Sequence, residues 1–231
     1  MQPFVKICGT TSALDARLSQ EAGADFLGVM LNHPASPRHI SLEAALEIRD
    51  SVSIPIVALS VNRNLEQLVE IADVLQPRAL QLHGDESPEL VAELAARGFE
   101  VWKAVSGDAA ALFEGATRFT KAGASAILVD AREVSSLGTV YGGTGHLADW
   151  NGARALVESG FRVILAGGLA PENVARATET VRPWAVDVVS GVEARKGVKD
   201  ASRLREFVAL AKLTADGQND SNQTSNHAVR I

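Results

Sequence analysis

Near its amino terminus the chain reads FVKICGTT, residues 4–11, in which a short β-branched apolar run stops at a glycine. A run of this kind, bounded by a turn residue, predicts a buried strand. An open, doubly wound sheet carries a glycine-rich nucleotide fingerprint directly after its first strand. The stretch after this strand, Gly9-Thr10-Thr11, does not match that fingerprint. The opening stretch therefore favours the other common architecture of repeated strand–helix units, a closed barrel.

The same kind of run recurs along the chain and alternates with longer amphipathic stretches. We expect eight strands, at a spacing of roughly 20 to 30 residues that suits repeated βα units. These strands are expected at residues 4–8, 26–31, 56–61, 79–83, 100–105, 126–130, 162–166 and 184–189. Eight strands that alternate with helices predict an α/β fold, a single (β/α)8 TIM barrel.

Helix signals between the strands support this count. Residues 64–75 carry apolar side chains at helical spacing, which predicts a helix with one buried face. Serines stand where N-caps belong, at Ser12, Ser41 and Ser87, and Pro171 stands where a first helical turn tolerates proline.

The alternating pattern continues to about residue 213 and then stops. Residues 1–213 are therefore expected to form one catalytic barrel domain. Residues 214–231 are too polar to bury an apolar face, so we expect a disordered C-terminal tail.

The bulk composition limits the classes of partner. With 46% hydrophobic and 22% charged residues, the chain has the make-up of an ordinary globular protein. Its net charge of −6 argues against nucleic acid or a membrane surface as a partner, because both favour a basic face. The chain shows no secretory or membrane-spanning apolar segment, so we expect a cytoplasmic protein. A small anionic ligand fits, since backbone amides bind phosphate even in an acidic protein.

Two reactive side chains stand at the ends of predicted strands, where barrels of this kind place their catalytic residues. Cys8 ends the first strand, and Asp130 ends the sixth. The lone cysteine is either a small buried apolar side chain or a thiol with a chemical task. Asp130 is either a loop cap or a general acid. Residue type alone leaves both alternatives open at both positions.

Glycines follow the last two predicted strands. Loops at this face of a barrel often bind phosphate through their N–H groups, so we expect phosphate near Gly167, Gly168 and Gly191 rather than tight turns alone. Gly143 belongs to a glycine-rich stretch after the sixth strand, which we interpret as a loop that closes over a substrate.

Other strand-end side chains are less specific. Arg38, after the second strand, either pairs with a carboxylate or phosphate or stands solvated at the surface. His83 ends the fourth strand, and without a second strand-end histidine we expect no metal there. Lys6 and Lys103 lie within strands, where burial beside a carboxylate is favoured over Schiff-base chemistry.

Taken together and in order, eight motifs resemble the phosphoribosylanthranilate isomerase family of tryptophan biosynthesis. They are KICG (6–9), SPR (36–38), QLHGDE (81–86), GGTG (142–145), DW (149–150), LAGGL (165–169), ENV (172–174) and SGVE (190–193). The resemblance spans about residues 4 to 213.

The resemblance implies an Amadori rearrangement of N-(5′-phosphoribosyl)anthranilate to 1-(2-carboxyphenylamino)-1-deoxyribulose 5-phosphate, with no cofactor or metal. It implies that Asp130 is the general acid on the furanose ring oxygen. It also implies that Cys8, as thiolate, is the base that removes the C2′ proton. An unperturbed thiol is only about 3% thiolate at pH 7, so the site has to favour the anion or work with that fraction.

The same resemblance implies the substrate contacts. Arg38 is expected to hold the anthranilate carboxylate, and His83 and Gly143 to contact the substrate. The loops at Gly167-Gly168 and Ser190-Gly191 are expected to bind the phosphate.

Three stretches depart from the usual family pattern around the aromatic half of the substrate: GVML (28–31), LSVN (59–62) and ADW (148–150). Two alternatives therefore stay open, a paralogous isomerase of another phosphorylated aminosugar and a non-catalytic barrel that binds sugar phosphate. A phosphopentose epimerase is disfavoured, because paired metal-ligand histidines are missing. We expect a small phosphorylated substrate and a monomer or homodimer.

Overall fold

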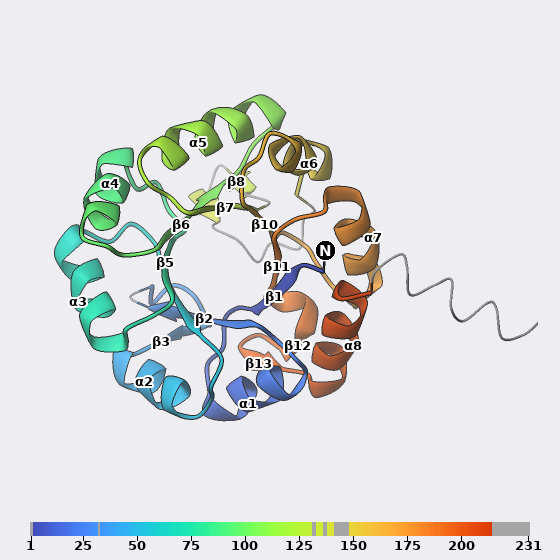
Figure 1. Ribbon diagram of the computed structural model, residues 1–231. Coiled ribbons are helices and arrows are strands. Elements are labelled where there is room, and N and C mark those ends of the chain that lie inside the picture. Colours follow the sequence, from blue (N-terminus) through green and yellow to red (C-terminus); the bar gives the residue numbers. More distant parts are fainter. Residues whose placement is uncertain (1, 32, 131–132, 136–137, 141–147, 214–231) are drawn as a thin grey trace, which may run out of the picture.

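The strands of the computed structural model close into a ring with helices around its outside (Figure 1). The structure describes the chain except for residues 1, 32, 131–132, 136–137, 141–147 and 214–231. The elements in this described part run from Phe4 to Ala211, so the domain bounds 1–213 stay a prediction, and the expected C-terminal tail lies outside the described residues.

Eight parallel strands make the barrel wall, and the pairing of β11 with β1 and of β1 with β2 closes it. In order around the ring they are β1 (Phe4–Ile7), β2 (Phe26–Leu31), β4 (Ile56–Ser60), β5 (Ala79–Leu82), β6 (Val101–Val105), β7 (Ala126–Val129), β10 (Val163–Leu165) and β11 (Ala185–Val188). The predicted (β/α)8 barrel is confirmed, with each observed strand inside its predicted range.

The helices that surround the wall follow the barrel strands in sequence. They are α1 (Ala13–Glu21), α2 (Leu42–Asp50), α3 (Leu65–Leu75), α4 (Pro88–Ala96), α5 (Ala109–Lys121), α6 (Trp150–Glu158), α7 (Pro171–Val181) and α8 (Ala201–Ala211). The predicted serine N-caps are confirmed, because the side chains of Ser12, Ser41 and Ser87 each accept a hydrogen bond from a first-turn backbone N–H. Pro171 occupies the first turn of α7 as expected.

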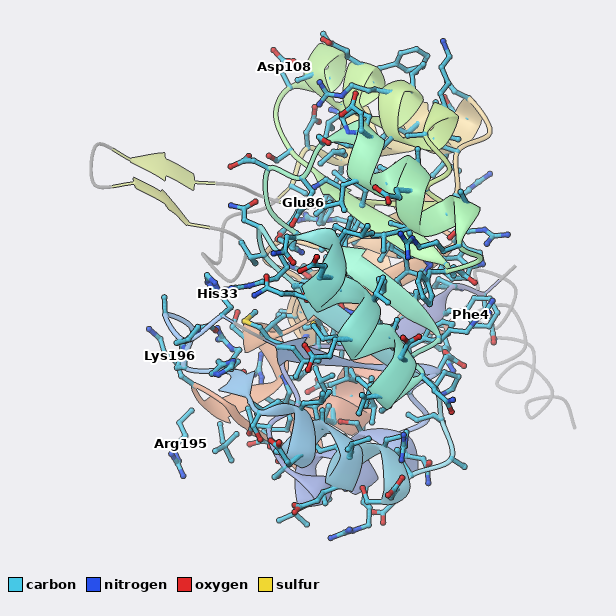
Figure 2. The ribbon with its side chains drawn as sticks, turned by 90° about the vertical axis from the view of Figure 1, so that its left-hand side faces the viewer. Phe4, His33, Glu86, Asp108, Arg195 and Lys196 are labelled. Atoms are coloured by element: carbon cyan, nitrogen blue, oxygen red, sulfur yellow. The ribbon has the colours of Figure 1, made fainter. Side chains whose placement is uncertain are left out.

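Short additional strands and a 3-10 helix lie at the carboxyl-terminal end of the barrel. Strand β3 (His39–Ile40) pairs with β2, and a short 3-10 helix (Ser190–Val192) follows β11. Two antiparallel hairpins are formed by β8 (Glu133–Ser135) with β9 (Gly138–Val140) and by β12 (Glu193–Arg195) with β13 (Val198–Lys199). Figure 2 shows the β8–β9 hairpin projecting from the same end of the barrel as His33.

Aromatic rings fill the opposite, amino-terminal end of the barrel. Phe4, Phe26, Trp102 and Trp184 stack with ring centroids 5.3 to 5.9 Å apart. Figure 2 places Phe4 and His33 at opposite ends of the molecule. Because the rings occupy the space inside one end of the barrel, a ligand is admitted at the other end.

The rest of the core lies between the strands and the helix ring, where a continuous apolar layer packs. None of the helices among the described residues has the length and apolar character needed to cross a membrane.

Candidate active site

A cavity of about 430 Å³ opens at the carboxyl ends of the barrel strands. Seven of the predicted site residues line it: Cys8, Arg38, His83, Asp130, Gly167, Gly168 and Ser190. An eighth, Gly191, packs behind the lining, and the ninth, Gly143, lies outside the described residues. Sequence positions from 8 to 190 are thus brought to one concave site, which is where barrel enzymes place their chemistry.

Cys8 reaches the cavity directly from the end of β1. Its backbone N–H donates to the carbonyl oxygen of Val188 at 2.9 Å, and its side chain is 1% exposed. Burial raises the pKa of the Cys8 thiol above its ordinary value, while the nearby Lys6 ammonium works in the opposite direction. The thiol form therefore predominates at neutral pH, and a thiolate here has to draw on its charged neighbours.

Lys6 lies on the same inward face of β1, two residues before Cys8. Its ammonium donates to Asp187 Oδ1 on β11 at 2.9 Å, and both side chains are buried. The expectation that Lys6 is buried beside a carboxylate is confirmed, and Lys103 likewise pairs with Glu86 at 3.0 Å. Asp187 itself lines the cavity and was missed by the sequence analysis, because an acid in the middle of an apolar strand shows no partner in sequence.

Asp130 follows β7 and is held by a histidine from β5. His83 Nε2 lies 3.0 Å from Asp130 Oδ2, and Gln81 Nε2 lies 3.0 Å from His83 Nδ1. With the Gln81 amide donating to Nδ1, the ring proton of a neutral His83 sits on Nε2 and points at Asp130. Gln81 was missed by the sequence analysis, although its place two residues before His83 on one strand puts both on the inward face.

Arg38 does not stand solvated at the surface, which was one of its two sequence-based interpretations. It is 9% exposed, and its Nε and Nη2 donate to the two carboxylate oxygens of Glu193 at 2.8 Å each. The hydrogen bonds to Glu193 raise the pKa of Arg38. Burial works to raise the pKa of Glu193, but Arg38 and the nearby Lys199 lower it on balance. This planar pair fixes the guanidinium at the cavity wall and leaves Nη1 for a ligand.

The loops after β10 and β11 meet beside the cavity. A Cβ at Gly191 would overlap the carbonyl oxygen of Leu169, so only glycine lets the two loops approach this closely. Ser190 starts the short 3-10 helix, and its neighbours Gly167 and Gly168 line the same wall. The arrangement presents backbone from two loops to one side of the cavity.

Part of the cavity wall is aliphatic. Met30, Leu59 and Val61 line the cavity, and they pack with Cys8. Two of the stretches that depart from the family pattern therefore do border the site. The third, residues 148–150, does not line the cavity, because Asp149 serves there as the N-cap of α6.

Within the part of the chain that the structure describes, no group of three or more His, Cys, Asp or Glu side chains is placed to hold a metal ion. The absence of a metal or cofactor from the reaction stays a prediction.

A family model and the similar proteins of known function name the same enzyme family. The family model described as N-(5′-phosphoribosyl)anthranilate (PRA) isomerase matches residues 5–210. The N-(5′-phosphoribosyl)anthranilate isomerase of Geobacter metallireducens is 42% identical over 213 residues, covering 90% of this chain and 98% of that protein.

Solved structures agree. A monomeric form of the dimeric phosphoribosylanthranilate isomerase from Thermotoga maritima superposes with a TM-score of 0.78 at 36% identity, covering 91% of this chain and 98% of that chain. A phosphoribosylanthranilate isomerase in complex with reduced 1-(o-carboxyphenylamino)-1-deoxyribulose 5-phosphate gives a TM-score of 0.76 at 36% identity, with the same coverage.

Proposed function

This chain belongs to the N-(5′-phosphoribosyl)anthranilate isomerase family, and from that premise we propose that Cys8 and Asp130 are the base and the acid of its reaction. The reaction is the Amadori rearrangement of N-(5′-phosphoribosyl)anthranilate, an aldose–ketose isomerisation of tryptophan biosynthesis. Its substrate is a small phosphorylated molecule.

In the proposed mechanism, Asp130 donates its proton to the furanose ring oxygen. The bond from that oxygen to C1′ breaks, and the amine nitrogen supplies the electron pair that makes an iminium. The Cys8 thiolate then removes the proton from C2′, and the C–H electron pair forms the C1′–C2′ double bond of the enolamine. The iminium charge is neutralised in that step, and tautomerisation gives the ketone product.

The observation that carries the assignment is the placement of the two groups. Cys8 and Asp130 line one cavity from β1 and β7, which stand apart in the ring with β10 and β11 between them. A sugar bound in the cavity is therefore approached by the acid and the base from different sides, as ring opening and C2′ deprotonation require.

We test the reaction itself with the purified protein and N-(5′-phosphoribosyl)anthranilate. Turnover is expected without added metal or cofactor, together with growth of a tryptophan auxotroph that lacks the isomerase. If the chain is instead a paralogous isomerase, it will turn over another phosphorylated aminosugar and leave N-(5′-phosphoribosyl)anthranilate unchanged.

His83 is assigned a role through Asp130. Its Nε2 lies 3.0 Å from the carboxylate, which fixes the side chain of the acid. Because His83 also lines the cavity, a direct contact with the substrate stays a prediction alongside this orienting role.

Phosphate is assigned to the loops at Gly167-Gly168 and Ser190-Gly191. Gly167, Gly168 and Ser190 line the same cavity as the aliphatic side chains of Met30, Leu59 and Val61, which supports a ligand with one anionic and one aromatic end. The expected closing loop at Gly143 lies outside the described residues.

Arg38 is assigned to the anthranilate carboxylate, and Arg38→Ala tests this. Its loss removes a charge-assisted contact of about 1.5 to 3 kcal/mol, which raises KM roughly ten- to a hundredfold with a smaller change in kcat. Titration with reduced 1-(o-carboxyphenylamino)-1-deoxyribulose 5-phosphate should show correspondingly weak binding.

The control for this variant removes the carboxylate that Arg38 leaves behind. Arg38→Ala removes both hydrogen bonds to the buried Glu193 carboxylate and leaves it only the ion pair with Lys199 at 3.6 Å, whereas the double variant Arg38→Ala with Glu193→Gln removes that carboxylate charge as well. We expect the double variant to recover melting temperature but not KM. Normal analogue binding by Arg38→Ala would mean that the guanidinium serves only to pair with Glu193.

The oligomeric state and the location of this protein are also part of the proposal. We propose a cytoplasmic monomer or homodimer, since the Thermotoga maritima relative is dimeric in one of its forms. Sedimentation of the purified chain distinguishes the two states.

A further inference from the structure

A buried cation lies directly beneath the cysteine at the end of β1. Lys6 and Cys8 are two residues apart, so the strand period of two places both on the inward face. The Lys6 side chain is 0% exposed, in an environment where an ammonium group is kept only with partners.

The side chains of Lys6 and Cys8 both lie against Gly28 of the neighbouring strand. A Cβ at Gly28 on β2 would lie 2.5 Å from Cys8 Sγ and 2.8 Å from Lys6 Nζ. The sulfur and the ammonium nitrogen therefore share the space that a larger residue at position 28 would fill.

Asp187 holds the cation from the other side. β1 and β11 pair in register with Lys6 opposite Asp187, and Nζ lies 2.9 Å from Oδ1. The result is a row of three buried groups, carboxylate, ammonium and sulfur, and the residues at its two ends, Asp187 and Cys8, both line the cavity.

We propose that Lys6 is a positioning residue for the sulfur, whose ammonium group stabilises the Cys8 thiolate and is shared between that thiolate and the carboxylate of Asp187. The proposal rests on the assignment of Cys8 as the base. In the C2′ proton transfer the sulfur gains the proton and loses its charge, so the row changes from two anions around one cation to one carboxylate paired with one ammonium.

The charges that face Cys8 come from four elements of the described structure. Lys6 lies on β1 and Asp187 on β11, while Lys199 of β13 donates from Nζ to the carbonyl oxygen of Cys8 at 2.6 Å, and Arg38 approaches from the loop before β3. Burial raises the pKa of Cys8 most, Lys6 and Lys199 lower it, and Asp187 raises it.

The two members of the Lys6–Asp187 pair therefore act on the thiol in opposite directions. Cys8 pKa is expected to rise in Lys6→Met, because the stabilising cation is gone, and to fall in Asp187→Asn, because a repelling carboxylate is gone. A purely structural role for the pair predicts loss of stability in both variants but no such opposition.

The test is a pH titration of the thiolate ultraviolet absorbance in the ligand-free protein. Cys8 is the only cysteine in the chain, so this signal reports a single group. Relative to wild type, we expect the midpoint to move up in Lys6→Met and down in Asp187→Asn. The pH profile of kcat/KM should move up with the midpoint in Lys6→Met.

Lys103→Met is the matched control. Lys103 is also a buried strand lysine paired with a carboxylate, Glu86 at 3.0 Å, but it stacks on Phe119 of the surrounding helix α5 rather than facing the barrel interior. Its loss should cost stability and leave the Cys8 midpoint unchanged.

The double variant Lys6→Met with Asp187→Asn covers the case in which Lys6→Met does not fold, since it leaves no unpaired buried charge. Its midpoint should lie between those of the single variants, because the two removed charges act on the thiol in opposite directions.

Midpoints that move in the same direction in Lys6→Met and Asp187→Asn overturn the proposal, as does an equal shift in Lys103→Met. Should Lys6→Met fail to fold, a double-variant midpoint at or below that of Asp187→Asn overturns it. Retained turnover by Cys8→Ala is a separate result, because it shows that Cys8 is not the base. The midpoints of the thiolate titration would still report whether Lys6 sets the acidity of the thiol.

Discussion

Cys8→Ala is expected to lower kcat by roughly a hundred- to ten-thousandfold, the contribution typical of a positioned acid or base. No group at that place remains to take the C2′ proton. The barrel should still fold, because alanine fills most of the buried space and the loss of the sulfur costs on the order of 1 kcal/mol. Steady-state kinetics and the melting temperature, measured on the same preparation, check both statements.

Cys8→Ser separates basicity from packing. Serine keeps the shape of the side chain, but its hydroxyl ionises far less readily than a thiol, so we expect a loss of turnover similar to that of alanine. Turnover within a few-fold of wild type in either variant removes Cys8 from the mechanism.

The pH dependence of the wild-type enzyme follows from the same assignment. The base acts as thiolate, so activity is lost as pH falls below the pKa of Cys8 and grows as pH rises toward it. Because burial raises that pKa above its ordinary value, kcat/KM should keep rising from neutral into alkaline pH. A flat profile over this range contradicts a thiolate base in the free enzyme.

Asp130→Asn is expected to reduce kcat by a similar factor, roughly a hundred- to ten-thousandfold, while the product analogue still binds. The amide keeps the shape of the carboxyl group but has no proton to give to the leaving ring oxygen. Titration with reduced 1-(o-carboxyphenylamino)-1-deoxyribulose 5-phosphate should therefore give near wild-type affinity. Arg38→Ala should show the reverse pattern, weak binding with most of kcat retained.

His83→Asn is the matched control for the acid. It removes the side chain that fixes Asp130 from 3.0 Å but leaves the acid itself, so we expect a smaller loss of kcat than in Asp130→Asn. If Asp130→Asn still turns over substrate, the acid lies elsewhere and the role given to the end of β7 is wrong.

The fold was predictable because its signals are local. Apolar runs bounded by turn residues, helical stripes between them, and the caps at Ser12, Ser41 and Ser87 each depend on a few neighbouring residues. The carboxyl ends of parallel strands meet at one end of a barrel, so the gathering of Cys8 and Asp130 also followed from strand order.

The contacts between those side chains were not predictable in the same way. Arg38 was interpreted as the partner of a carboxylate or phosphate or as a solvated surface group, and only the structure identifies one partner as the carboxylate of Glu193, 155 positions along the chain. Asp187 was missed because nothing near it in sequence marks it as the partner of Lys6.

The sequence by itself thus determined which elements form and in what order, because these depend on local propensity and periodicity. Only the tertiary structure decided which buried charges meet. Closure of the barrel sets β1 against β11 in register and brings Lys6 opposite Asp187. The chemistry of Cys8 depends on that pairing, because the acidity of a buried thiol is set by the charges packed around it rather than by its neighbours along the chain.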